Sequence, residues 1–303
     1  MRLIDAHVHI LPETALGSVN SRFGYEYAPY GFQKIPDVGG FQVMPPYVHD
    51  TQFTADTLVH MMDVYGVERA VIQQSILNEQ NAAVADAVAK YPDRLSGSMI
   101  LEPGAHWREE LLHWKEAGLQ SIKFEMRAFT MACPGIGYDH PWMNEMMALA
   151  RLENLTVVFD PAPVDFPVYR PELLYDALRG LAGLRVVICH LGYPKPLRSE
   201  DAQKKWQDMT DLARLPGVWL DVSAMPDLFE EEGWPYPTAA ALLRQVKDRA
   251  GAEKLIWGTD VPGTLCNATY PQMQRMFRIP GLLTEREQQL LFAENAEAAY
   301  GLL

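Results

Sequence analysis

Two histidines separated by one residue, His7 and His9, are the residues of this 303-residue chain whose types and spacing most suggest chemistry. On a β-strand, side chains alternate between two faces, so both imidazoles would point to one side together with Asp5. Ala6 and Val8 would then face the surrounding helices. Two imidazoles spaced in this way can bind one metal ion together. The segment therefore predicts a metal site or an acid–base site.

Other polar residues stand at the ends of short apolar runs rich in Val and Ile. An aspartate near the histidine pair would add a carboxylate ligand or a general base. A further histidine would add a proton carrier or another ligand. The residues at these run ends are Lys123, Glu125, Arg127, Asp160, His190, Asp221, Ser223 and Asp260.

These residues also have structural interpretations. A His-x-His pair arises by chance, Asp260 could cap a helix, and His190 could be a hydrogen-bonded core histidine. Such interpretations must place each residue at a strand end independently, whereas one shared site explains all the placements. We therefore expect His7, His9, His190 and Asp260 to meet in one pocket.

Eight apolar runs alternate with segments that carry helix signals. This alternation implies parallel strands joined by crossover helices. Eight units predict an α/β fold of the (β/α)8 TIM-barrel type, in which catalytic groups lie at the carboxyl ends of the strands. An open doubly wound sheet is the alternative, because periodicity does not reveal closure. The expected strands span 2–10, 68–73, 95–101, 119–125, 155–160, 184–190, 218–222 and 254–260.

Helix boundaries can be placed from capping residues. Thr54 is suited to cap a helix that Gly66 would end. Pro141 and Pro171 stand where a first helical turn would begin. The last helix is expected over 284–300.

The stretch 11–53 is long, irregular and rich in Gly, Pro and aromatic residues. A loop of this length in a compact domain usually serves function. We interpret it as a lid or pocket wall over the first strand. No linker or low-complexity segment interrupts the chain, so 1–303 is expected to form one domain.

Composition narrows the class of protein. A net charge of −13 argues against a nucleic-acid partner, which would require a basic surface. No apolar run is long enough for a membrane span, and the N-terminus lacks the features of a signal peptide. The cysteines, three in number, predict reduced thiols and a cytoplasmic location.

Three motifs resemble the amidohydrolase-related superfamily. They are Asp5-Ala-His7-Val-His9 at the start, Cys189-His190-Leu-Gly near two-thirds of the chain, and Trp257-Gly-Thr-Asp260-Val-Pro near the end. The resemblance extends over nearly the whole chain, in the family's order. It is strongest to the branch that includes aminocarboxymuconate-semialdehyde decarboxylase and resorcylate-type decarboxylases.

The resemblance implies roles for particular residues. His7 and His9 would be metal ligands, Asp260 a metal ligand or the general base, and His190 a group that polarises the substrate or carries a proton. Asp160 departs from the pattern, because metal-binding members of this branch usually have histidine at that place. With Asp160 as an oxygen ligand, the set would suit one Zn²⁺ or Mn²⁺ ion. The alternative is a metal-free site, as in some lactonase relatives.

Several functions follow from this resemblance. The first is hydrolysis of an ester, lactone or amide bond of a small carboxylated substrate by a metal-activated water, with Lys123, Arg127 and Lys195 holding the carboxylate. The alternatives are non-oxidative decarboxylation of a ring or dienoic acid in the same pocket, a metal-independent lactonase, and a catalytically silent binding protein. Barrels of this branch are often dimers or larger assemblies.

Overall fold

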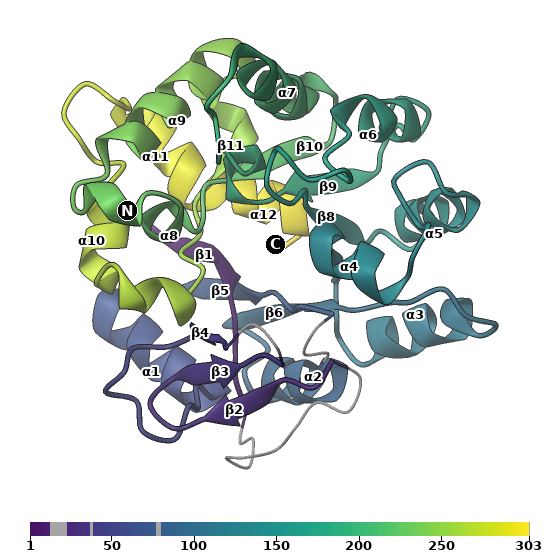
Figure 1. Cartoon of the computed structure of the whole chain (residues 1–303), viewed down its shortest axis with the longest axis horizontal. Coiled ribbons are helices and arrows are strands. Elements are labelled where there is room, and N and C mark those ends of the chain that lie inside the picture. The colour runs from purple at the N-terminus through teal and green to yellow at the C-terminus, as the bar shows by residue number, and fades with distance from the viewer. Residues whose placement is uncertain (13–22, 37–38, 77–79, 303) are drawn as a thin grey trace.

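A ring of parallel β-strands surrounded by helices forms the centre of the computed structural model (Figure 1). The structure describes residues 1–12, 23–36, 39–76 and 80–302. The strands follow one another around the sheet in chain order, as the predicted barrel requires. They are β1 (Ile4–Val8), β5 (Arg69–Ile72), β6 (Leu95–Met99), β7 (Ser121–Glu125), β8 (Thr156–Asp160), β9 (Arg185–Ile188), β10 (Val218–Asp221) and β11 (Leu255–Ile256).

Backbone hydrogen bonds between the first strand and the segment after β11 bring the ends of the sheet together. Ala6 N donates to Trp257 O over 3.1 Å, and His9 N donates to Val261 O over 2.7 Å. A parallel bridge also pairs Val8 with Val261. The sheet is therefore a nearly closed barrel, and the predicted TIM-barrel class is confirmed rather than the open sheet.

Helices pack around the barrel, and several begin where the sequence predicts. Thr54 accepts a hydrogen bond from Thr57 N, and Gly66 ends that helix in the left-handed conformation. Pro141 and Pro171 each occupy a first helical turn. The helices are α1 (Ala55–Tyr65), α2 (Asn81–Lys90), α3 (Trp107–Glu116), α4 (Met126–Ala132), α5 (Pro141–Leu152), α6 (Pro171–Leu178), α7 (Glu200–Asp211), α8 (Met225–Leu228), α9 (Pro237–Ala250) and α10 (Tyr270–Arg275), with 3-10 turns at His190–Gly192, Leu212–Arg214, Glu230–Glu232, Ala252–Lys254 and Gly263–Cys266.

The C-terminal helix runs without a break from Glu285 to Tyr300, close to the predicted range, and has a π-helical turn in its middle. It comprises α11 (Glu285–Gln289), a π-helical turn (Leu290–Glu294) and α12 (Asn295–Tyr300). The Leu291 carbonyl, which lies in the π-turn, accepts a hydrogen bond from Trp257 N over 2.8 Å. This hydrogen bond links the residue that directly follows β11 to the C-terminal helix.

The amino end of the barrel is closed by α12. Carbonyl groups of Ala299 and Leu302 accept hydrogen bonds from Thr156 and Arg69, which begin β8 and β5. Apolar side chains from this helix pack against residues that point into the barrel, so this end is a sealed core. Those inward residues include Ile4, Ala6, Val71, Val158, Val187 and Ile256.

An irregularity in β1 changes which side chains face inward. The register of β1 against β5 shifts between Asp5 and Val8, as at a β-bulge. Ala6 therefore points into the barrel. Asp5 instead accepts hydrogen bonds from Thr259 and from the Tyr270 hydroxyl, which lies on α10 outside the barrel. The predicted shared direction of Asp5, His7 and His9 is thus wrong for Asp5.

The described part of the stretch 11–53 contains regular structure, contrary to the irregular loop predicted. It forms a small antiparallel sheet, in which the middle strand pairs with both neighbours. Residues 13–22 and 37–38, which belong to the predicted lid, lie outside the described residues. The strands are β2 (Glu26–Ala28), β3 (Phe32–Lys34) and β4 (Phe41–Gln42).

Two further sequence predictions concern the cysteines and the membrane. Cys189 and Cys266 are free thiols, and Cys133 donates from Sγ to Glu102 over 3.6 Å. Among the described helices, none combines the length and apolar character needed to cross a bilayer.

Candidate active site

A cavity of about 380 Å³ lies over the polar strand ends. The strand-end residues form one wall of the cavity. The small sheet forms another and contributes Tyr27, Gln33 and Phe41. The stretch after β1 is therefore part of the cavity wall. Six of the predicted site residues line this cavity, namely His7, His9, Lys123, Asp160, His190 and Asp260.

His7 is held in one tautomer by a buried carboxylate. Its Nδ1 lies 2.9 Å from Asp221 Oδ2, so this nitrogen carries the proton and Nε2 keeps a lone pair. Burial, together with the positive charge of Lys123, lowers the pKa of His7 to about 4, so the ring is neutral at pH 7. Nε2 is buried and accepts no hydrogen bond within the described part of the chain.

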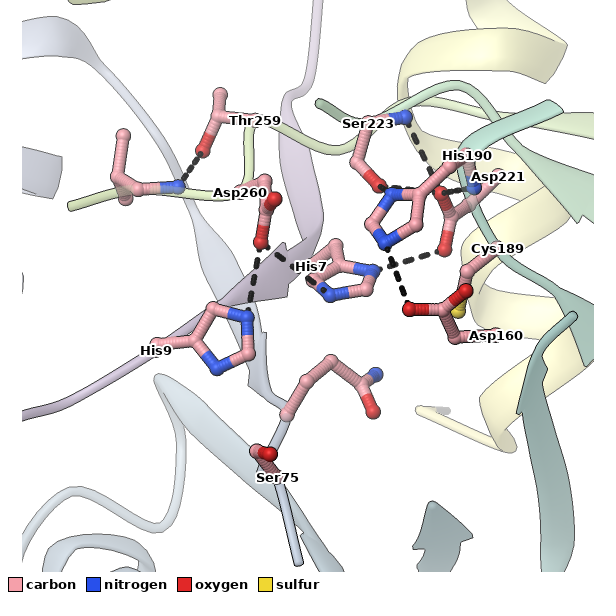
Figure 2. Close-up of polar contacts among 12 residues, drawn as sticks. His7, His9, Ser75, Asp160, Cys189, His190, Asp221, Ser223, Thr259 and Asp260 are labelled. Atoms are coloured by element: carbon pink, nitrogen blue, oxygen red, sulfur yellow. Dashed lines mark hydrogen bonds and ion pairs between the residues drawn. The ribbon is translucent and has the colours of Figure 1, made fainter. Parts of the chain in front are cut away.

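His9 and His7 converge on one carboxylate. His9 Nε2 lies 2.8 Å from Asp260 Oδ1, and His7 Nε2 lies 3.5 Å from the same oxygen (Figure 2). Burial opposes the charge of Asp260, but the hydrogen bond from His9 and the nearby imidazoles hold the pKa of that carboxyl well below its usual range. Ligand atoms of the three residues lie within 4.8 Å of one another, a separation that a metal ion can bridge.

The close approach of β1 to the segment after β11 depends on a glycine. A Cβ atom added at Gly258 would lie 2.8 Å from His7 Cβ and 3.0 Å from His7 N. Asp260 N also donates to the His7 carbonyl over 2.7 Å. The lack of a side chain at Gly258 therefore lets the segment that carries Asp260 approach the strand that carries His7.

His190 stands opposite this group with a different charge state. Its Nδ1 is 2.9 Å from Ser223 Oγ, and its Nε2 is 3.5 Å from Asp160 Oδ2 (Figure 2). Burial opposes protonation of His190, but the carboxylates of Asp160, Asp260 and Asp221 outweigh burial and raise the pKa to about 9. His190 is thus an imidazolium at pH 7, and it sits in a left-handed backbone conformation with φ of 56°.

Asp160 lies apart from the predicted metal ligands. Neither of the candidate ligand groups among the described residues includes it, because its carboxylate faces His190. Burial opposes its charge, but His190 and Lys123 lower the pKa of Asp160. The structure therefore does not bring Asp160 to the His7–His9–Asp260 group, and its position explains the charge on His190.

Of the three cations predicted to hold a substrate carboxylate, Lys123 alone lines the cavity. Its Nζ donates to Cys189 Sγ over 3.2 Å. Burial opposes its charge, but Cys189, Asp160 and Asp221 raise its pKa above the usual value. Cys189 also belongs to the second candidate ligand group, formed by His7, Cys189 and Asp221, so the Lys123 ammonium contacts one member of that group.

Arg127 and Lys195 lie outside the cavity lining. Arg127 begins the exposed face of α4, where its guanidinium stacks 4.8 Å from the centre of the Phe166 ring. A helix starts directly after Glu125, and it turns Arg127 away from the strand direction. The prediction that these two cations face the pocket is not supported.

Several residues reach the cavity that the sequence analysis did not assign to it. Asp227, on α8, lines it, and burial raises the pKa of this carboxyl to about 6. Gln73 and Gln80 flank the loop after β5. Amide residues in loops carry no periodic pattern, so the sequence held no feature that would have identified them.

The fold and the site together define a class of protein. A TIM barrel with a histidine–carboxylate cluster in a cavity at the carboxyl ends of its strands is the arrangement of a barrel enzyme. The chain belongs to the amidohydrolase family, whose model matches residues 4–302. It is an enzyme of the amidohydrolase type, so the silent binding protein is the least supported of the functions predicted.

One curated relative and two solved structures illustrate the similarity. An L-fucono-1,5-lactonase from Burkholderia ambifaria is 31% identical over 134 residues, which are 41% of this chain and 42% of that protein, so less than half of the relative is matched. A probable 2-pyrone-4,6-dicarboxylic acid hydrolase from Acinetobacter baumannii with citric acid bound has a TM-score of 0.71 at 21% identity, covering 99% of this chain and 100% of its own. An amidohydrolase from Burkholderia multivorans with bound zinc has a TM-score of 0.71 at 14% identity, covering 100% of both chains. The likeness to these two structures establishes the fold.

Proposed function

We propose that this protein hydrolyses the ester bond of a small lactone or ester. The observation that carries the proposal is the convergence of His7 Nε2, His9 Nε2 and Asp260 Oδ1 opposite the His190 imidazolium in one cavity. Such an arrangement offers an ionised acceptor on one side of a carbonyl group and a charged donor on the other. These are the two groups that acyl transfer to water requires.

The His7–His9–Asp260 group has the properties of a site for a divalent cation. His7 Nε2 is a buried lone pair that meets no hydrogen-bond donor among the residues the structure describes, and Asp221 holds the opposite nitrogen of the ring. A carboxylate that orients a ligating histidine in this way is a recurrent feature of metal sites. With Zn²⁺ or Mn²⁺ bound, the ion would supply Lewis-acid polarisation of oxygen atoms in the cavity.

The chain's own residues supply the remaining chemistry. His190 carries a proton on Nε2, so it can donate a hydrogen bond to the carbonyl oxygen of the substrate and stabilise negative charge as it develops there. Asp160 keeps that proton in place through its negative charge. Asp260 is ionised, so its carboxylate can accept a proton from the attacking water.

The names of two similar proteins agree with this reaction. The curated relative is an L-fucono-1,5-lactonase, and one structural neighbour is a probable 2-pyrone-4,6-dicarboxylic acid hydrolase. Another neighbour contains bound zinc, which supports the proposal of a divalent ion.

The test is a screen of lactones and esters in which acid release is followed with a pH indicator. We expect turnover by the wild type and a loss of about 10²–10⁴-fold in kcat for Asp260→Asn, since a positioned general base contributes on this order. Asp248→Asn, on the exposed side of α9, is the matched control and should retain full activity. Full activity of Asp260→Asn would contradict the proposal.

The same screen separates hydrolysis from decarboxylation. Carboxylic acids tested beside the lactones would release CO2 if the pocket decarboxylates its substrate. CO2 release without hydrolysis of any ester would favour the decarboxylase alternative. Metal analysis of wild type and His7→Ala, before and after chelation, decides whether activity follows the metal content.

A further inference from the structure

Asp227 brings a second carboxyl group to the cavity, and only one of its oxygens has a partner. Its Oδ1 accepts a hydrogen bond from Asn267 Nδ2 over 2.8 Å. The side chain forms no other hydrogen bond or ion pair with the residues that the structure describes. Asp227 is partly exposed and lines the cavity. One oxygen is therefore held in place, while the other, Oδ2, is available to a ligand.

The space in front of this oxygen is kept open by Gly263. A Cβ atom added at Gly263 would have two described atoms within 4 Å beyond its chain neighbours, Asp227 Oδ2 and the Val43 carbonyl oxygen, each 3.9 Å away. Gly263 and Val43 both line the cavity. A substrate atom can therefore approach Oδ2 from the cavity.

The order of the strands puts Asp227 between the two groups already assigned to the reaction. In the sheet, β10 lies between β9 and β11. Asp227 lies on α8, which follows β10, whereas His190 follows β9 and Asp260 follows β11. All three side chains line one cavity. A substrate held by His190 and attacked from the side of Asp260 would therefore also lie near Asp227.

The surroundings of Asp227 favour its protonated form more than those of Asp260 do. Burial raises the pKa of Asp227 to about 6, and the negative charge of Asp260 adds to this effect, whereas the hydrogen bond from Asn267 opposes it. The pKa of Asp260 is instead held well below its usual range. Two carboxyl groups whose pKa values are pushed apart in one cavity are suited to the separate roles of acid and base. The remaining titratable groups that face Asp227 are those of Glu230, His190, Tyr236 and Cys266.

The second half of ester hydrolysis requires a proton donor. When the bond between the carbonyl carbon and the leaving oxygen breaks, the electron pair stays on that oxygen, and a strongly basic alkoxide leaves slowly unless it is protonated at the same time. A proton from Asp227 Oδ2 would form the new O–H bond and leave Asp227 as a carboxylate. Asp260 then holds the proton taken from the attacking water, and exchange with solvent restores both groups.

We propose that Asp227 is the general acid of the reaction and delivers the proton from Oδ2 to the leaving oxygen of the substrate. This inference rests on the proposed hydrolysis of an ester bond. The alternative donor is Asp260, which would return the proton that it takes from water. In that case Asp227 would have no part in the step.

Two six-membered lactones with different leaving oxygens distinguish these donors. Opening of δ-valerolactone releases an alkoxide, whereas dihydrocoumarin releases a phenolate, a weaker base that needs less help from an acid. Asp227→Asn keeps an oxygen for the hydrogen bond from Asn267 and removes the transferable proton. Below pH 6, we expect it to lower kcat/KM for δ-valerolactone by about 10²–10⁴-fold and kcat/KM for dihydrocoumarin by less than about tenfold. Glu231→Gln, at an exposed position outside the cavity lining, is the matched control and should change neither value.

The pH dependence of the ratio of these two kcat/KM values, δ-valerolactone over dihydrocoumarin, follows the proton itself. In the wild type the ratio should be highest below pH 6 and should fall by about tenfold per pH unit above it, because Asp227 loses its proton there. Groups that serve both lactones alike cancel in this ratio. In Asp227→Asn the ratio should be low and independent of pH.

The possible failures can be told apart. Hydrolysis of both lactones by Asp227→Asn with the wild-type ratio would overturn the inference and leave the proposed reaction in place, with Asp260 as the donor. An equal loss of both rates would assign Asp227 a structural role and would also overturn the inference. If no lactone or ester in the screen is hydrolysed, the proposed reaction is wrong, and this inference is wrong with it.

Discussion

Replacing Asp221 by asparagine should change the tautomer of His7 while leaving its position intact. Oδ1 of Asp221 accepts hydrogen bonds from His190 N over 2.9 Å and from Ser223 N over 3.1 Å, and also from the Ser223 hydroxyl. Oδ2 faces His7 Nδ1. In Asp221→Asn the amide oxygen must stay with these donors, so the amide NH2 group turns toward His7.

His7 would then have to accept at Nδ1 and carry its proton on Nε2. The lone pair that faces Asp260 in the wild type would be lost. Changes of this kind in the carboxylate behind a ligating histidine typically cost 10–100-fold in metal affinity or activity. The expected loss of binding free energy is therefore about 1.4–2.8 kcal/mol.

Metal affinity can be measured by competition with a chromophoric chelator, and the tautomer by ¹⁵N NMR of the His7 ring. Ser223→Ala is the control, because it removes the hydroxyl that contacts His190 Nδ1 and Asp221 Oδ1 and leaves the contact between His7 Nδ1 and Asp221 Oδ2. Zn²⁺ affinity of Asp221→Asn equal to that of the wild type, or a His7 ring still protonated on Nδ1, would refute the reasoning.

Three further predictions follow from the packing and the charges. Gly258→Ala should lower activity at least about tenfold and destabilise the fold by about 1–3 kcal/mol, because the new Cβ would lie 2.8 Å from His7 Cβ. Gly104→Ala is the control, since a Cβ there would meet nothing within 4 Å. If Gly258→Ala had the same kcat/KM and unfolding midpoint as this control, the prediction would be wrong. Asp227 has a folded pKa of about 6 against an ordinary 3.8, so its contribution to stability is complete below pH 3.8 and is lost as the pH rises through 6. Asp227→Asn should therefore gain on the order of 1–3 kcal/mol relative to wild type between pH 4 and pH 7 in denaturant titrations, and a pH-independent difference would exclude this explanation. Ala296→Leu, in the sealed amino end of the barrel, should cost about 1–3 kcal/mol in urea denaturation through overpacking, while Ala298→Leu on the exposed side of the same helix should cost less.

Much of the barrel could be predicted from the sequence because its determinants are local. Strand positions follow from the runs of Val and Ile, and helix starts follow from residues such as Thr54, Pro141 and Pro171. The positions of His7, His9, His190 and Asp260 at strand ends follow from the same pattern. A barrel gathers the carboxyl ends of its strands at one mouth, so these residues were expected to meet.

The partner of each group was decided by the tertiary structure. Alternation along a strand predicts that Asp5 faces inward with the histidines, but a register shift in β1, absent from the pattern, turns it outward. Asp160 was expected beside the histidine pair, yet β8 lies next to β9, and this neighbour places the carboxylate against His190. Arg127 is directed outward by the helix that begins at Met126.

Contacts between distant segments account for the remaining features of the site. Asp221 lies more than 200 positions from His7, and it decides which nitrogen of that ring carries the proton. Gln73 and Gln80 line the cavity, and they follow β5, which adjoins β1 in the barrel. The sequence thus determined which groups stand at the mouth of the barrel, because periodicity and turn residues act over a few positions. Closure of the barrel decided which groups touch. Those contacts in turn set the protonation states of His7 and His190 and left His7 Nε2 without a donor among the described residues.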